Sequence, residues 1–159
     1  MSLSETVYKI CLGFAKNPWD AQDLTQDVYL KAFRNLDSLK DNKYARDWLF
    51  RIARNTALDH GRKHRVRQIF LAQSRGEPAE TRPPEYQLDH AESLRSLKKA
   101  VRQLPKKLRD VFILREYGDL SYREIAEILG IKDGTVMSRL LRAREAVRMQ
   151  MMEKEYEKK

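Results

Sequence analysis

Apolar residues with helical spacing lie on both sides of a short turn within residues 119–148, and this feature constrains the fold more than any other. They are Ile125, Ala126 and Leu129 before the turn and Val136, Leu140 and Ala143 after it. In the turn, Gly130 can adopt a positive φ, Ile131 can enter the core, and Asp133 is placed to cap the next helix. The stretch therefore predicts a helix-turn-helix motif.

The second helix of this motif carries short polar side chains and guanidinium groups on the side opposite its apolar residues. They are Thr135, Ser138, Arg139 and Arg142. Such side chains suit the major groove of DNA, where a guanidinium can bind the edge of guanine with two hydrogen bonds. From this stretch alone, an ordinary helical hairpin with solvated arginines is the alternative.

The charge of the whole chain narrows the class of partner. The sequence has 159 residues and a formal net charge of +9, and 35% of its residues are charged. This balance favours a polyanionic partner over a small acidic substrate, although solubility alone explains part of it. The length allows one ordinary domain or two small ones.

Cys11 is the only cysteine, so the chain can form neither an intrachain disulfide nor a cysteine-cluster metal site. We expect it to be a small, buried apolar residue in a reducing cytoplasm. The sequence contains no run of about 18 apolar residues and no signal-peptide pattern. It therefore predicts a soluble, intracellular protein with no membrane insertion.

Residues 4–14 and 21–36 each show the apolar spacing of an amphipathic helix, with Ser4 as a candidate N-cap of the first and Asp20 as a residue suited to begin the second. The second helix has a buried stripe that includes Leu24. Beside this stripe lies an acidic patch formed by Asp20, Asp23, Gln26 and Asp27. The helix macrodipole accounts for part of the acidity. A basic partner surface is the other explanation.

A third helix is expected over residues 44–66, with a basic stripe along its outer side. The stripe comprises Arg51, Arg54, Asn55, Leu58, Arg62 and Arg65, and Lys63 and Arg67 extend it. Trp48 and Phe50 are expected to be core and edge residues. His60 and His64 have the spacing of two metal ligands on one helix face, but the surrounding cations would repel a metal ion. We therefore interpret them as residues close to phosphate.

Residues 68–91 contain one glycine and three prolines and no apolar repeat, which predicts a flexible linker. The predicted fold is all-α, with two small helical domains at residues 1–67 and 92–159, the second containing the helix-turn-helix. The motif would begin at a capping box formed by Ser121 and Glu124. We expect each domain to bury its own core, without a core that continues through the chain.

Parts of both domains resemble a known family of bacterial proteins. The sequences DAQDLTQDVYLKAFRNL at 20–36 and WLFRIARNTALDHGRK at 48–63 are similar to the second conserved region of extracytoplasmic-function (ECF) sigma factors, in the sigma-70 family. The sequence at 96–144, which includes GTVMSRLLRAR, is similar to their fourth conserved region. The resemblance implies an alternative sigma factor, which directs core RNA polymerase to specific promoters and helps to open the minus-ten element without being an enzyme.

The resemblance implies that the acidic patch binds RNA polymerase. Asp23, Gln26 and Asp27, with Leu24 beneath them, match the surface by which sigma factors hold the clamp helices of the largest catalytic subunit. Those helices are basic, so the charges are complementary. The resemblance further implies promoter DNA and an anti-sigma factor as partners and the bacterial cytoplasm as the location.

The resemblance assigns DNA contacts to both domains. For the minus-ten element it implies the loop residues Leu39 and Asn42 together with Arg54, Asn55, Asp59, Arg62 and Lys63. This surface would capture a base extruded from the duplex, which recovers the few kcal/mol that unstacking costs. For the minus-35 element it implies Thr135, Ser138, Arg139 and Arg142. It implies no catalytic residue, cofactor or metal.

The chain departs from the family pattern in two respects. The family usually carries further helical residues before the equivalent of Val7, so a shorter N-terminal helix is expected here. The aromatic residues with which housekeeping sigma factors melt promoters are absent. We therefore expect melting to depend on the loop near Leu39 and to favour a stringent promoter sequence.

Two other functions compete with this hypothesis. A free-standing helix-turn-helix transcriptional regulator with an N-terminal helical interaction domain explains the C-terminal half equally well, but it does not explain an acidic helix followed by a basic one. An enzyme acting on nucleic acid is disfavoured, because the sequence shows no carboxylate cluster, glycine-rich phosphate loop or nucleophile-base pair.

Overall fold

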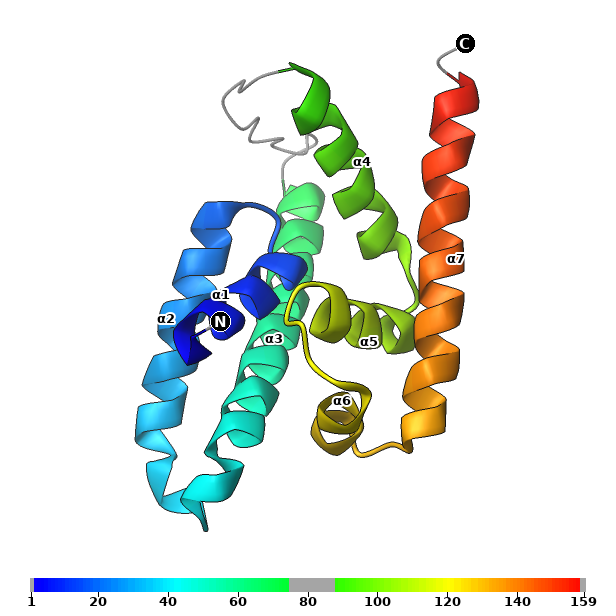
Figure 1. Ribbon diagram of the computed structural model, residues 1–159. Helices are drawn as coiled ribbons and strands as arrows, with labels where there is room; N and C mark the ends of the chain where they lie inside the picture. Colours follow the sequence, from blue (N-terminus) through cyan, green and yellow to red (C-terminus); the bar gives the residue numbers. More distant parts are fainter. Residues whose placement is uncertain (1, 75–87, 158–159) are drawn as a thin grey trace.

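The computed structural model describes residues 2–74 and 88–157, and every regular element within these ranges is a helix (Figure 1). The N-terminal domain contains α1 (Leu3–Phe14), α2 (Pro18–Arg34), the short 3₁₀ helices η1 (Leu36–Ser38) and η2 (Asn42–Tyr44), and α3 (Ala45–Ser74). The C-terminal domain contains α4 (Leu88–Gln103), α5 (Lys106–Glu116), α6 (Tyr122–Leu129) and α7 (Asp133–Glu157). The predicted all-α fold with two helical domains is confirmed. No described helix is long and apolar enough to cross a bilayer.

Two helices begin earlier than predicted because other side chains cap them. The cap of α1 is Ser2 rather than Ser4, since the Ser2 Oγ accepts a hydrogen bond from the backbone amide three residues later (3.2 Å). The cap of α2 is Asn17, whose Oδ1 accepts a hydrogen bond from the backbone amide of Asp20 (2.8 Å). Pro18 then fits the first helical position, because the missing amide hydrogen is not needed there.

The ends of the predicted linker are helical. Residues 68–74 extend α3, and residues 88–91 form the first turn of α4. The rest of the predicted linker, residues 75–87, lies outside the described residues.

The helix-turn-helix is present, and its local geometry explains its ends. The Ser121 Oγ accepts a hydrogen bond from the Glu124 backbone amide (3.2 Å), and the Glu124 carboxylate accepts one from the Ser121 amide (2.7 Å), which is the predicted capping box. Gly130 ends α6 with a φ of 65°, a conformation that strains other residues. Asp133 is the first residue of α7 and not its cap. The predicted inner residues Ile125, Ala126, Val136, Leu140 and Ala143 are buried, and Leu129 is partly buried.

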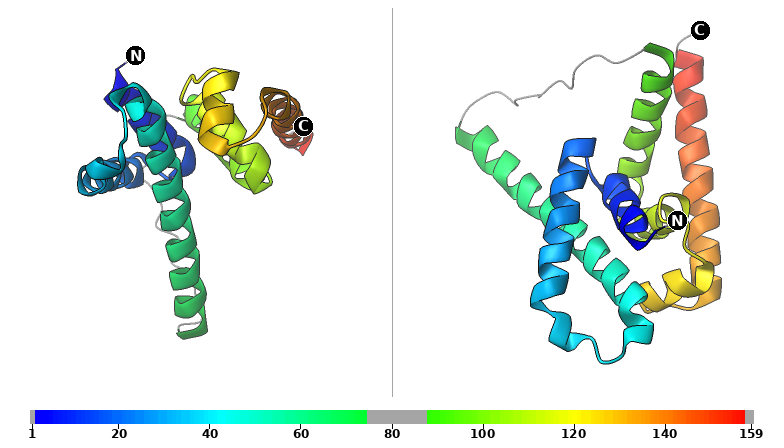
Figure 2. Two further views of the ribbon diagram at one scale, coloured as in Figure 1. Left: turned by 90° about the horizontal axis from the view of Figure 1, so that it is seen from below. Right: turned by 60° about the vertical axis from the view of Figure 1, so that its left-hand side comes forward.

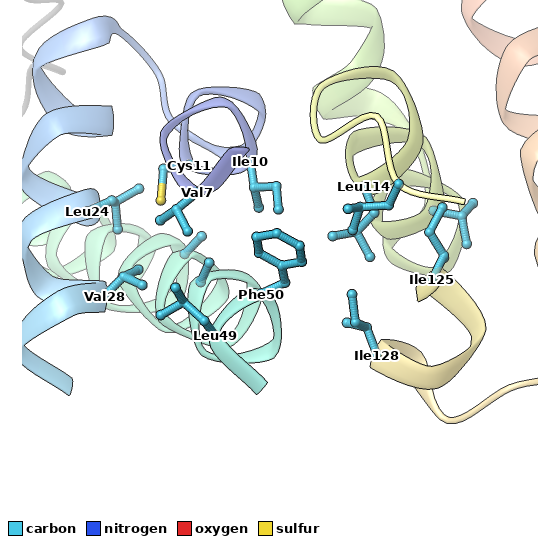
Figure 3. Close-up of a cluster of buried hydrophobic side chains, with 14 of the residues drawn as sticks. Val7, Ile10, Cys11, Leu24, Val28, Leu49, Phe50, Leu114, Ile125 and Ile128 are labelled. Carbon is cyan, nitrogen blue, oxygen red and sulfur yellow. The ribbon is translucent and has the colours of Figure 1, made fainter. Parts of the chain in front are cut away.

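Helix α1 contacts α2 and α3 within its own domain and α5 in the other (Figure 1). Leu24 and Val28 of the predicted α2 stripe are buried against it (Figure 3). Cys11 is also buried there, as predicted. Burial raises the pKa of the Cys11 thiol to about 11, so the thiol stays protonated at neutral pH.

The two domains share one continuous apolar core, contrary to the expectation of separate cores. Phe50 of α3 is completely buried and lies between Ile10 of α1 and Leu114 of α5 (Figure 3). Ile128 of α6 completes this side of the core, where α3 contacts α6 (Figure 2). Phe50 is therefore a core residue rather than an edge residue, because a second domain covers the side of α3 that it occupies.

Glycines allow α1 and the end of α5 to approach closely. A Cβ atom at Gly13 would lie 2.5 Å from Cγ2 of Ile113, and one at Gly118 would lie 2.7 Å from the carbonyl oxygen of Leu114 and 3.0 Å from Cγ1 of Ile10. The first two separations are shorter than atoms in van der Waals contact allow. The contacts of Gly13 with Ile113 and of Gly118 with Ile10 cross between the domains, so close packing of α1 against the end of α5 needs the absence of a side chain at Gly13 and is helped by its absence at Gly118.

Candidate nucleic-acid interface

One face of α2 is exposed and acidic near the start of the helix. Asp23, Gln26 and Asp27 all point away from the core, and neither aspartate forms an ion pair within the described residues. Leu24 is buried beneath them in the N-terminal core. It can therefore position this face, but it cannot itself touch a partner.

The same face continues with apolar side chains that the sequence analysis missed. Leu30 and Phe33 follow Asp23 and Asp27 at helical spacing, and 54% and 79% of their surfaces are exposed. Exposed apolar patches of this kind mark interaction surfaces. The sequence shows that Leu30 and Phe33 lie outside the buried stripe of this helix. An apolar residue outside the stripe can belong to a binding surface or can simply be exposed to solvent, and the sequence does not distinguish the two cases. We call the surface formed by Asp23, Gln26, Asp27, Leu30 and Phe33 the α2 face.

A polar cluster lies on the middle of α3. Asn55, Asp59 and Arg62 are three and four residues apart, and the Arg62 Nη2 donates a hydrogen bond to the Asp59 Oδ1 (2.8 Å). The Lys31 Nζ of α2 lies 4.0 Å from the Asp59 Oδ2. Lys63, which follows Arg62 in the sequence, is exposed. The structure thus brings together an amide, a carboxylate and several cations, which offer both donors and acceptors to a nucleic-acid base.

Leu39 and Asn42 lie in the connection between α2 and α3, at the N-terminal end of α3 (Figure 1). Asn42 is exposed and Leu39 is partly buried. The Trp48 Nε1 donates a hydrogen bond to the Ser38 Oγ (3.2 Å), which ties this connection to α3. Asn55 lies about 15 Å along the helix from its first residue, given a rise of about 1.5 Å per residue. The loop and the polar cluster are therefore successive parts of one surface rather than a single pocket.

Arg54, which was predicted to contact minus-ten DNA, lies between this cluster and the C-terminal domain, and its Nη1 donates a hydrogen bond to the Asn55 Oδ1 (3.1 Å). Its guanidinium binds the carboxylate of Asp110 on α5 through Nη2 and through Nε, with an Nε to Oδ2 distance of 3.1 Å. The two side chains are 19% and 4% exposed, so the ion pair is shielded from water. Separating it without solvent access would leave a buried charge unpaired, which is costly. In this arrangement the Arg54 guanidinium is bound to the C-terminal domain through Asp110.

Other basic residues of α3 also contact the C-terminal domain. The Arg51 Nη2 donates a hydrogen bond to the carbonyl oxygen of Glu127 (2.9 Å), and the Arg46 Nη1 pairs with the Glu124 Oε1 (2.8 Å). The predicted basic stripe is therefore divided. Its first part is bound to the other domain, and its later part, which includes Arg62, is exposed to solvent.

The same interface places two acidic side chains together. Burial raises the pKa of Asp47, and a hydrogen bond to Glu127 and the negative charge of that residue raise it further. A carboxyl pKa that is higher in the folded protein than in the unfolded chain makes the contact favourable at acid pH and unfavourable as the pH rises through the folded pKa.

We expect Asp47→Asn to raise the melting temperature at neutral pH, because the amide can still donate to Glu127 but carries no negative charge. The gain should shrink as the pH falls toward the ordinary aspartate pKa of 3.8, where the parent carboxyl takes up its own proton. Thermal unfolding from neutral to acid pH measures the difference. The control is Asp37→Asn, at an exposed position of η1. An equal gain in that variant would contradict the explanation.

The exposed side of α7 carries the residues predicted to read DNA. Ser138 and Arg142 are exposed, and Thr135 and Arg139 are partly buried. The Ser138 Oγ donates a hydrogen bond to the carbonyl oxygen of Thr135 (3.2 Å). Neither guanidinium has an ion-pair partner within the part of the chain that the structure describes, so both are available to phosphates and base edges.

Two apolar residues extend this side of α7 and were missed by the sequence analysis. Met137 and Leu141 are 57% and 69% exposed, beside the predicted polar residues. Apolar groups at such positions can contact the methyl group of thymine. The sequence analysis placed Leu140 on the inner side, where it is buried, and the neighbouring Leu141 lies on the outer side.

The histidine pair on α3 is placed next to a cation. The His60 and His64 ring centroids are 6.5 Å apart, and the Lys16 Nζ lies 3.0 Å from the His64 Nδ1. Partial burial lowers the pKa of His64, and the charge of Lys16 lowers it further. Among the described residues, no group of three or more histidine, cysteine or acidic side chains could hold a metal ion.

Comparisons with known proteins match both domains. The Sigma-70 region 2 model matches residues 1–67, and the Sigma-70 region 4 model matches residues 94–147. The chain is 32% identical over 156 residues to the ECF RNA polymerase sigma factor SigW of Bacillus subtilis. The matched region covers 92% of this chain and 83% of that protein. The chain belongs to the ECF sigma factors.

Other members of the ECF sigma family agree with this assignment. The sigma-E factor of Escherichia coli K12 is 36% identical over 137 residues, covering 80% of this chain and 72% of that protein. The solved structure of the sigma factor RpoE from Bartonella quintana, in complex with the anti-sigma factor NepR, has a TM-score of 0.68 at 28% identity and covers 94% of this chain and 92% of that one. In this ECF sigma factor, region 2 carries the α2 face and the polar cluster of α3, and region 4 carries the helix-turn-helix.

Proposed function

We propose that this ECF sigma factor directs core RNA polymerase to specific promoters in the bacterial cytoplasm and helps to open the minus-ten element. Region 2 binds the clamp helices of the largest subunit through the α2 face. The observation that carries the proposal is that the exposed acidic and apolar face of α2 and the unpaired guanidinium groups of α7 belong to different sigma regions of one chain. A structural relative was solved with an anti-sigma factor, and we propose such a partner here too.

The DNA contacts are divided between the two regions. Region 4 reads the minus-35 major groove through α7, with Arg139 and Arg142 as donors to guanine. Region 2 holds an unstacked minus-ten base against the polar cluster of α3, with the loop at Leu39 and Asn42 beside it. Arg54 reaches DNA only after the domains separate, because Asp110 binds it in the compact arrangement.

Run-off transcription with purified core polymerase on a pool of promoter fragments tests the function. We expect specific transcripts only when both proteins are present. The isolated protein should bind duplex DNA weakly, because linked modules gain affinity only when their separation matches the two DNA sites, and polymerase sets that separation. Tight promoter binding by the isolated protein, together with no stimulation of core enzyme, would instead identify a free-standing regulator.

We expect Arg139→Ala to weaken promoter complexes formed with polymerase by about 1 to 3 kcal/mol, or roughly 5- to 150-fold, because it removes a two-hydrogen-bond contact to a base. The affinity should decrease only for promoters with the preferred minus-35 sequence, and the two proteins should bind equally well to a promoter in which the contacted base is changed. The control is Arg148→Ala, an exposed arginine further along α7. Similar losses in both variants and on every sequence would indicate a phosphate contact only.

A further inference from the structure

A strongly basic cavity of about 660 Å³ lies between the two domains. The turn between α1 and α2, the middle of α3 and the connection between α4 and α5 bound it. Its cations are Lys16, Arg62 and Arg65 from the N-terminal domain and Arg102, Lys106 and Arg109 from the C-terminal domain. Asp20 is the one acidic residue in the lining formed by the described residues.

Most of these cations have no anionic partner. Apart from Arg62, none forms an ion pair within the described part of the chain. The Lys16 Nζ lies 3.0 Å from a ring nitrogen of His64 instead of a carboxylate. Arg109 donates from Nη1 to the carbonyl oxygen of Arg102 (3.3 Å), but its Nε is buried without an acceptor. Buried donors are nearly always paired, so the hydrogen-bonding capacity of Arg109 is not fully used within the described residues.

Cations of the two domains influence each other across the cavity. Partial burial lowers the pKa of the Lys16 ammonium, and the charge of Arg102 on the opposite domain lowers it further. The compact arrangement therefore brings like charges together. The shared apolar core and the ion pair between Arg54 and Asp110 oppose this repulsion. An anion between the domains would convert the repulsion into attraction on both sides.

We propose that this cavity binds a small polyphosphate anion, either inorganic or as part of a nucleotide, and that the bound anion holds the two domains together. Phosphate oxygens accept charge-assisted hydrogen bonds from lysine and arginine. The volume is within the range of about 300 to 1,000 Å³ found for small-ligand sites. Because Arg62 belongs to the minus-ten surface as well, an occupied cavity withdraws it from DNA. The site requires neither polymerase nor promoter, so it stands apart from the proposed function.

Calorimetric titration of the full chain with tripolyphosphate, and separately with a nucleoside triphosphate, tests the site at constant ionic strength, with sulfate as a reference anion. We expect tripolyphosphate to bind at one site and to raise the melting temperature, and sulfate to do neither. Tighter binding of the nucleotide would identify it as the source of the anion. Equal binding would show that the phosphate chain alone is recognised.

Two neighbouring lysines provide a matched comparison. Lys106 and Lys107 are both exposed on the first turn of α5, but only Lys106 lines the cavity. We expect Lys106→Ala to weaken tripolyphosphate binding roughly 10-fold, and Lys107→Ala to have little effect. Lys16→Ala, in the other domain, should behave like Lys106→Ala.

Equal losses in the two neighbouring lysine variants would overturn the site, because they would indicate general charge attraction. So would identical behaviour of tripolyphosphate and sulfate. Binding of a single-stranded oligonucleotide without any binding of tripolyphosphate would also overturn it and assign the basic cavity to a DNA strand.

Discussion

Replacing both Asp23 and Asp27 by lysine is expected to abolish transcription directed by this sigma factor while leaving its fold intact. Both carboxylates are exposed and have no ion-pair partner within the described residues, so their reversal should change stability little. Against a basic polymerase surface, each new ammonium replaces an attraction with a repulsion, and like charges at an interface cost several kcal/mol. We expect binding of core polymerase to weaken by more than about 100-fold.

Fluorescence anisotropy with labelled protein measures that binding, and run-off transcription measures the functional loss. The matched control is Glu153→Lys, which reverses one exposed charge near the end of α7, and it is compared with the single variant Asp27→Lys. Unchanged transcription by the double variant would remove the α2 face from the mechanism. A free-standing regulator would also retain its DNA binding after these changes.

Phe50→Ala should produce the largest loss of stability, about 3 to 5 kcal/mol. The ring is completely buried between the two domains, so its removal leaves a cavity that neither domain can fill alone. A loss of this size is a large part of the 5 to 15 kcal/mol by which a domain is usually stable. Urea unfolding followed by circular dichroism gives the free energy directly.

The exposed Phe33 provides the control for this measurement. We expect Phe33→Ala to change the free energy of unfolding by less than about 0.5 kcal/mol, because the ring is 79% exposed. It should nevertheless weaken the binding of core polymerase, since the ring lies on the α2 face. Equal destabilisation by the two phenylalanine variants would contradict the explanation that burial of the Phe50 ring stabilises the fold.

Local features of the fold are set by the amino-acid pattern. The capping box of Ser121 and Glu124 and the left-handed Gly130 need only nearby residues, so the helix-turn-helix and its outward residues could be predicted. The exposed Asp23 and Asp27 were equally predictable, because a helix with a single apolar stripe has a single buried side.

For the apolar end of the α2 face, the sequence predicts the position of the side chains on the helix but not their exposure to solvent. Leu30 and Phe33 are outside the buried stripe, but a large apolar side chain outside a stripe can still be covered by another element. The structure shows that nothing within the described residues covers them, and 54% and 79% of their surfaces are exposed.

The surroundings of the α3 side chains depend on packing between residues far apart in the chain. Its periodicity placed Phe50 at an edge and Arg54 on an open basic surface, yet the first is fully buried and the second is paired with Asp110. Apolar spacing identifies the side of a helix that packs against its sequence neighbours. It carries no information about a second domain that reaches the opposite side, because that contact depends on shape and charge complementarity between separately patterned surfaces.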